Sequence, residues 1–61
     1  MANSEYIVNY TDEEEGLQAR RVSSRAAALD LAPALISYPE TIRGSVVIFP
    51  ADGSGGKEYI G

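Results

Sequence analysis

The stretch from Ser23 to Ser37 is the only long helix-forming run in this chain of 61 residues. Its sequence, SSRAAALDLAPALIS, has a single charged residue, Asp30, between Ala26 and Ile36. A helix that lies on one sheet needs an apolar stripe on only one side. The apolar character of this stretch therefore predicts that some surface besides its own sheet covers part of the helix.

Serine and proline residues mark the limits of the predicted helix. Ser23 or Ser24 is the expected N-cap, because a serine hydroxyl accepts a hydrogen bond from the free amides of the first helical turn. Pro33 lacks an amide donor and clashes with the preceding turn. The helix therefore either ends near Ala32 or kinks and continues to Ser37.

The residues before the helix alternate in a way that predicts a strand. In residues 5–11, EYIVNYT, the side chains of Tyr6, Val8 and Tyr10 lie on one side of the extended chain. Mostly polar residues lie on the other side, which is the period of a half-buried strand. Ile7 is the apolar exception on the polar side.

A turn and a second strand are expected next. Residues 12–16, DEEEG, suit a turn, since aspartate opens turns and glycine adopts positive φ at little cost. Residues 17–22, LQARRV, then return as the second strand of a hairpin. We expect Leu17 and Ala19 on the same side of the sheet as the two tyrosines and the valine of the first strand.

A single helix from residue 12 to residue 31 is the alternative to this hairpin. Acidic residues favour the first turn of a helix, and EEEGLQARR tolerates helical structure. Gly16 and the β-branched Val22, which precedes two serines, disfavour that helix.

The residues after the helix predict two further strands. Ser45–Phe49, SVVIF, has four consecutive strand formers without alternation, which is typical of a strand that is central or covered on both faces. Residues 50–56, PADGSGG, have the composition of a flexible glycine-rich loop. Residues 57–60 can form a short final strand.

The predicted order of elements, β-β-α-β-β, describes a small single α+β domain over residues 1–61. One helix packs on an antiparallel or mixed sheet of three to four strands, and residues 1–4 are expected to be disordered. This element order resembles the β-grasp architecture, and its first four elements are similar to those of some small phage-encoded inhibitors of host enzymes. No motif accompanies the resemblance, so it implies no residue roles.

Composition narrows the class of protein further. The chain has no cysteine and no histidine, so disulfides and the usual zinc ligand sets are excluded. A net charge of −4 disfavours binding to nucleic acids or anionic membranes and favours a basic partner. No signal peptide and no membrane-spanning apolar run is visible, so we expect a cytoplasmic protein.

No catalytic, cofactor-binding or metal-binding residues are predicted. The segment from Ala51 to Lys57 approximates a phosphate-binding loop, but Glu58 stands where that loop needs serine or threonine. The acidic run Asp12–Glu15 lacks the spacing of calcium loops. No pair of nucleophile and base is evident, and a fold of this size offers little room for a cleft. We expect a non-enzyme with no small-molecule substrate and no cofactor.

The first hypothesis for function is a protein-binding module, a regulator or inhibitor that occupies a partner's surface, or a homo-oligomer. At 100° per residue, the apolar residues of the helix fall on two different sides, and one sheet can cover only one of them. One side carries Ala26, Leu29, Pro33 and Ile36. The predicted partner-binding residues are Leu31, Leu35, Ala27 and Ala28. In the alternative, Pro33 breaks the helix and Leu35 folds back into the core.

The second hypothesis is nucleic-acid binding through an arginine cluster, and the third is a structural subunit of a larger assembly. Arginine side chains that gather on one surface can contact phosphates. The residues of the predicted cluster are Arg20, Arg21, Arg25 and Arg43.

Overall fold

The computed structural model describes residues 4–61, so most of the predicted disordered segment, residues 1–3, lies outside the described residues. The elements follow in the order β1 (Tyr6–Asp12), β2 (Gly16–Val22), α1 (Arg25–Ile36), β3 (Val47–Pro50) and β4 (Glu58–Tyr59). All strand pairs are antiparallel, and the strands lie side by side in the order β2-β1-β3-β4. The predicted α+β domain with β-β-α-β-β order is confirmed.

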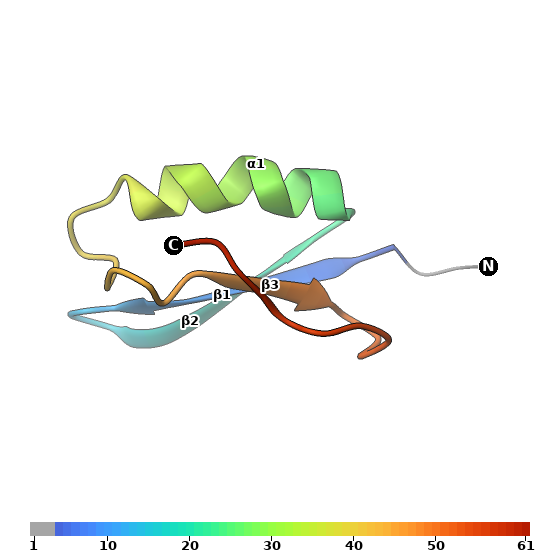
Figure 1. The fold of residues 1–61 in the computed structure, drawn as a ribbon. Helices are drawn as coiled ribbons and strands as arrows, with labels where there is room; N and C mark the ends of the chain where they lie inside the picture. The colour runs from blue at the N-terminus through green and yellow to red at the C-terminus, as the bar shows by residue number, and fades with distance from the viewer. Residues whose placement is uncertain (1–3) are drawn as a thin grey trace.

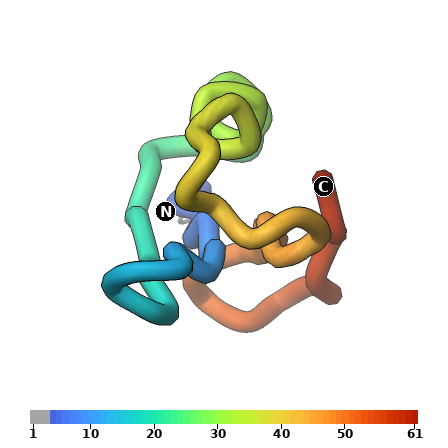
Figure 2. Tube along the Cα trace, turned by 90° about the vertical axis from the view of Figure 1, so that its left-hand side faces the viewer, coloured from blue at the N-terminus to red at the C-terminus, as the bar shows by residue number. Residues whose placement is uncertain are grey.

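The molecule has two layers, with α1 across one face of the sheet (Figure 1). The view turned by 90° shows the same arrangement, with the loop of residues 51–57 extending past β3 on the side away from α1 (Figure 2). Among residues 4–61, no helix or second sheet covers that side.

β1 is the central strand, and it is paired on both sides along its length. Its first half pairs with β3. Its second half is bound by the connection between α1 and β3: the Ile42 amide donates to the Thr11 carbonyl at 2.8 Å, and the Thr11 amide donates to the Ser45 hydroxyl at 3.0 Å. The Glu13 amide donates to the Glu40 carbonyl at 2.8 Å. These hydrogen bonds hold the connection against the hairpin.

The helix begins as the serines predict and runs through the proline. Ser24 is the N-cap, and its hydroxyl accepts from the Ala27 amide at 3.1 Å. Pro33 lies inside α1, and the helix continues to Ile36, so the alternative of an early end is wrong. The proline side chain is exposed, so its ring takes no part in the contact between α1 and the sheet. Its missing amide deprives the Leu29 carbonyl of a helical donor.

The hydrophobic core lies between α1 and the covered face of the sheet. Its fully or almost fully buried side chains come from the helix, from β1 and from β3 with the residue before it: Val8, Tyr10, Ala28, Ala32, Leu35, Val46 and Ile48. Leu31 and Val22 pack against this cluster while partly exposed. Alanine at the two most buried helix positions lets the helix approach the larger side chains of the sheet closely.

The side of the helix that faces the sheet is the reverse of the prediction. Ala28 and Leu35 are buried in the core, Leu31 packs against it, and Ala27 is half-buried. The physical reason is that an almost uniformly apolar helix has two possible contact sides. The side with two alanines at its centre packs on the sheet.

The hairpin forms as predicted, but its register differs by one residue. Asp12 pairs with Gly16 across three turn residues, and Tyr10 pairs with Gln18. The Asp12 carboxylate accepts from the Glu14 amide at 2.8 Å, and Gly16 closes the turn at a φ of 82°. Because side chains alternate along a strand, this shift turns Leu17 onto the opposite face. The expectation that Leu17 and Ala19 share the side of Tyr10 is therefore wrong, and the alternative long helix is wrong as well.

β3 lies between β1 and β4, as its unbroken apolar sequence predicts. Residues 51–57 connect it to β4, which is shorter than the predicted final strand. The pairing continues beyond β4, since the Ile60 amide donates to the Val46 carbonyl at 2.8 Å and the Val46 amide donates to the Gly61 carbonyl at 2.9 Å.

Candidate functional site

The face of the sheet away from α1, here called the open face, carries apolar side chains that no helix among residues 4–61 covers. Cross-strand register defines it, because paired residues in a sheet point to the same face. On β1 and β3 it pairs Ile7 with Phe49, and on β3 and β4 it pairs Val47 with Tyr59. The complete set of residues in the four strands is Ile7, Asn9, Thr11, Leu17, Ala19, Arg21, Val47, Phe49 and Tyr59.

Exposure varies strongly across the open face. Tyr59 is 75% exposed and Leu17 is 72% exposed, the two highest values among the large exposed hydrophobic side chains. Val47 is only 7% exposed although no second layer covers it. Ile7 and Phe49 are half-buried. The inner strands of the open face thus combine the apolar Ile7, Val47 and Phe49 with the polar Asn9 and Thr11. Large exposed side chains stand on both outer strands.

Two basic side chains border the open face. Arg21 forms an ion pair with Glu5 at 2.8 Å between Nη1 and Oε1. The Lys57 ammonium lies 5.7 Å from the centre of the Phe49 ring, within the range of a cation–π contact. The acidic residues are concentrated elsewhere, with four of the nine in the run 12–15 at the tip of the hairpin. The open face therefore has two basic side chains at its border, of which Arg21 is paired with Glu5, and the acidic tip of the hairpin next to Leu17.

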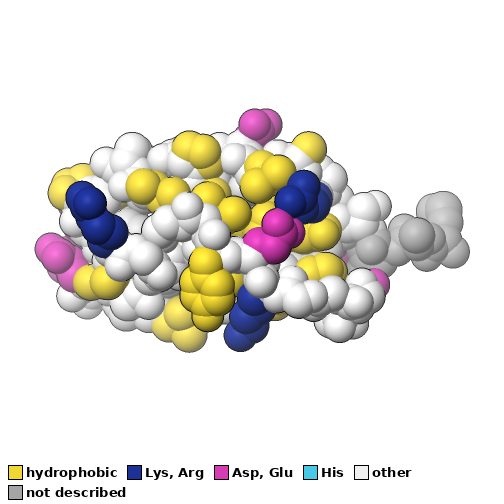
Figure 3. All heavy atoms as spheres, in the orientation of Figure 1, with side chains coloured by type: hydrophobic (Ala, Val, Ile, Leu, Met, Phe, Trp, Pro, Cys, Tyr) yellow, Lys and Arg dark blue, Asp and Glu magenta, His cyan; other side chains and the backbone are white. Residues whose placement is uncertain are grey.

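A second apolar surface lies on the outer side of α1. Its large exposed side chains are Leu29 and Ile36, with Ala26 and Pro33 beside them, which is the side that the sequence assigned to the sheet. Figure 3 shows hydrophobic side chains reaching the surface over the helix and below it.

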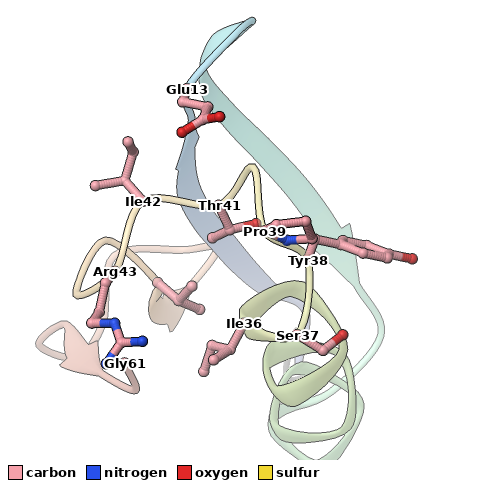
Figure 4. Close-up of a pocket in the computed structure, with 10 residues that line it drawn as sticks. Glu13, Ile36, Ser37, Tyr38, Pro39, Thr41, Ile42, Arg43 and Gly61 are labelled. Atoms are coloured by element: carbon pink, nitrogen blue, oxygen red, sulfur yellow. The ribbon is translucent and has the colours of Figure 1, made fainter.

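An open hollow of about 750 Å³ adjoins the end of the helix. Ile36, Ile42 and Val46 supply apolar walls, and Glu13 and Arg43 supply charges of opposite sign. Figure 4 shows that Ile36 points into this hollow while Tyr38 points away from it. Its volume lies within the range of small-molecule pockets, but it opens to solvent between a helix end and a surface loop.

The four arginines of the predicted nucleic-acid site do not form a cluster. Arg20 and Arg21 are neighbours on β2 and therefore point to opposite faces of the sheet. Arg25 opens α1, whereas Arg43 follows the other end of this helix, which is roughly 18 Å long. Arg21 and Arg25 are also already paired with carboxylates.

The ion pair between Arg25 and Glu58 joins α1 to β4. Two hydrogen bonds link them, from Nε to Oε2 at 3.1 Å and from Nη2 to Oε1 at 2.8 Å. The hydrogen bond from Arg25 lowers the pKa of Glu58, and the same bond with the charge of Glu58 raises the pKa of Arg25. Hydrogen bonds from Ser54 lower the pKa of Asp52 in the loop before β4. Each of these shifts has a local structural cause, and none lies in a cleft.

Residues 4–61 contain neither a metal-binding group nor a membrane-spanning helix. No group of three acidic side chains in this part of the chain converges to hold a metal ion. No helix within the same residues has the length and apolarity that crossing a membrane requires.

The open face was not identified from the sequence, although two sequence signals point to it. Ile7 breaks the polar side of the first strand, and residues 46–49 show no alternation. Both put apolar side chains on the face of the sheet that the single helix cannot reach. Leu17 was not assigned to this face, because the register predicted for the hairpin is wrong by one residue.

Comparison with protein-family models, with characterised proteins and with solved structures finds no match for this chain.

Proposed function

We propose that this protein is a non-enzymatic protein-binding module that docks onto a folded partner in the cytoplasm through the open face of its sheet. By occupying the partner's surface, it acts as a regulator or inhibitor. The target-contacting side chains are Tyr59, Phe49, Ile7 and Leu17, with Val47 as the dry centre.

One observation carries this proposal: β3 has the sequence of a strand covered on both faces, but the chain covers only one. An antiparallel sheet usually turns polar residues to solvent on its uncovered face. Here the two inner strands place three apolar residues, Ile7, Val47 and Phe49, on that face, against two polar ones, Asn9 and Thr11. Contiguous apolar surface of this kind is typical of interaction sites, in which buried aromatic side chains supply much of the binding energy.

The border of the open face indicates the chemistry of the partner. Arg21 and Lys57 flank the apolar centre, and each can donate hydrogen bonds to a carboxylate. The guanidinium of Arg21 contacts Glu5 through Nη1, and a guanidinium has five N–H donors, enough to bind more than one carboxylate. The matching surface is therefore apolar at its centre with aspartate or glutamate at its rim.

The nucleic-acid alternative has weaker support. A basic surface that follows a phosphate backbone needs several arginines side by side. Arg25 and Arg43 lie at opposite ends of α1, so they do not share such a surface. Arg21 and Arg25 are each paired with a carboxylate, which reduces their positive charge. An enzyme has no support from the geometry, since no nucleophile and base meet in a cleft.

The test is affinity capture from the source cell with three forms of the protein in parallel. These are the natural chain, Tyr59→Asp on the open face, and Leu29→Asp on the outer side of α1 as the matched control. Both positions carry exposed apolar side chains, so both variants should fold. We expect a partner that the natural chain and the control retain and that Tyr59→Asp loses.

Chemical shift mapping with that purified partner then locates the contact. The expected changes centre on the amides of Ile7, Val47, Phe49 and Tyr59. Equal retention by all three forms, or shifts confined to α1, would contradict the proposal. Binding of DNA or RNA that weakens steeply with salt and is lost on replacing Arg20 and Arg21 would favour the alternative function instead.

A further inference from the structure

The outer edge of β2 presents unpaired backbone groups. Thr11 uses its amide and carbonyl toward Ser45 and Ile42, on the side away from β2. In an antiparallel pair, residues alternate between hydrogen-bonded and non-hydrogen-bonded positions. Leu17, the partner of Thr11, therefore directs its own amide and carbonyl outward. By the same alternation, Ala19 and Arg21 do so as well.

Among residues 4–61, the protection of this edge is limited to the charged side chains of Arg20 and Arg21. β2 is the terminal strand of the sheet and runs for seven residues, Gly16–Val22, without a proline or an internal bulge in its pairing with β1. Protective devices such as prolines, bulges or a covering loop are the usual treatment of an exposed edge. β2 is therefore open to the addition of another strand.

The charges at the two ends of β2 are opposite. Glu13, Glu14 and Glu15 precede the strand, and Arg20 and Arg21 lie at its end. A second copy of β2 that lies antiparallel places its acidic end beside the basic end of the first. A two-fold axis repeats this match at both ends of the contact.

We propose that two copies of this chain pair through β2 in an antiparallel manner, with the two-fold axis at Gln18. In this register Leu17 faces Ala19 of the second copy, so a large apolar side chain lies against a small one. Glu15 faces Arg21 of the second copy. Leu17 and Ala19 of each copy direct their backbone groups at one another across the axis, which gives a short ladder at the centre. Glu15 contributes only its charge, because its amide and carbonyl are bound within the turn by Asp12 and Gln18.

Other registers of the same strands are less complementary. An axis at Arg20 or Arg21 places like-charged arginines opposite each other, which is unfavourable. An axis at Ala19 places the apolar Leu17 against Arg21. The axis at Gln18 therefore combines apolar contacts at its centre with opposite charges at its ends.

The pairing joins two four-stranded sheets into one of eight strands. The side chains of Leu17 and Ala19 lie on the open face, so the two open faces become one continuous surface. This inference goes beyond the proposed function, because strand pairing uses the edge of β2 whereas partner binding uses the face. The two surfaces share Leu17 and Arg21, so they are separated by Tyr59→Asp, which lies on β4 and changes partner binding only.

Sedimentation equilibrium of a charge-swap set tests the pairing. The natural chain is expected to show a concentration-dependent dimer. Arg21→Glu and Glu15→Arg each place like charges at both ends of the contact and should each weaken self-association by about tenfold. An equimolar mixture of the two variants restores opposite charges at both ends and should form a heterodimer.

Two variants serve as matched controls. Arg43→Glu makes the same charge change in the connection before β3, and Asp30→Arg makes the opposite change on the helix. Both residues are exposed and lie outside β2. Both variants should associate like the natural chain.

Amide hydrogen exchange at two protein concentrations provides an independent measurement. The outward amides of Leu17 and Ala19 should gain protection as concentration rises, whereas dimers formed through the open face would leave them unprotected. A chain that stays monomeric at millimolar concentration would overturn the proposal. So would a dimer that neither charge variant weakens.

Discussion

The two faces of the sheet carry similar apolar side chains but meet different surroundings. On the covered face, Val8 and Ile48 are fully buried beneath α1. On the open face, Ile7 and Phe49 come from the same two strands, and the chain provides no layer for them. Hydrophobicity alone therefore does not separate the core of this domain from its exposed surface.

A sheet with two apolar faces and a single helix has one face that the helix cannot cover. A chain of about 60 residues buries only about 60% of its unfolded surface. The covered face supplies the stability of the fold. The difference between the two faces is measurable as a difference in the effects of substitutions.

Ile48→Ala should have the largest effect. It removes buried methylene and methyl groups from the covered face and leaves a cavity, at an expected cost of about 2–5 kcal/mol in the free energy of unfolding. Because so small a core rarely supplies more than about 3–5 kcal/mol, the variant should be largely unfolded. Urea denaturation followed by circular dichroism measures the loss. A variant as stable as the natural chain would remove the distinction between the two faces.

Ala32→Leu should have the next largest effect. Ala32 is fully buried at the contact between α1 and the sheet, so added atoms must displace the helix at a cost of about 1–3 kcal/mol. Ala26→Leu, on the exposed side of the same helix, is the matched control and should leave the midpoint of thermal unfolding nearly unchanged. Equal effects at both positions would show that the contact side of α1 is assigned incorrectly.

Tyr59→Ala and Leu17→Ala should change stability only slightly. Both side chains are more than 70% exposed on the open face, and such surface substitutions usually change the free energy of unfolding by at most about 0.5 kcal/mol. Denaturation curves of the two variants should overlay that of the natural chain. A loss comparable to that of Ile48→Ala would mean that the open face also belongs to the core.

The smallest effect concerns the ion pair at the border of the covered face. Arg25 lowers the pKa of Glu58 in the folded state, so the pair stabilises the fold above the ordinary glutamate pKa. That contribution is lost as pH falls through the lowered pKa of Glu58. Arg25→Gln should move the Glu58 titration upward toward its ordinary value, as followed by the NMR shift of its carboxyl carbon. An unchanged titration would exclude the pair as the cause.

Elements whose signals are local could be predicted from the sequence. Ser24 caps the helix because its hydroxyl accepts a hydrogen bond from the Ala27 amide, only three residues away. Asp12 and Gly16 specify the turn of the hairpin for similar local reasons. The unbroken apolar run of residues 46–49 correctly indicated a strand inside the sheet.

Features that depend on packing could not be predicted in the same way. The side of α1 that meets the sheet is ambiguous, because Leu31 and Leu35 on one side match Leu29 and Ile36 on the other in hydrophobicity. The hairpin register depends on how many residues the turn holds, and one residue exchanges the two faces of β2. The wrong register also affects the candidate site, because it placed Leu17 on the covered face although Leu17 lies on the open face.

The central position of β1 determines when this fold can be completed. β1 and β2 are adjacent in the chain, so their hairpin can form locally, but an isolated two-stranded hairpin is marginally stable in water. The second neighbour of β1 is β3. The two strands pair through residues such as Ile7 and Phe49, which are about 40 positions apart in the sequence. During synthesis β1 therefore keeps one unpaired edge until the helix and β3 have been made. Closure of that long loop is the step expected to limit the folding rate.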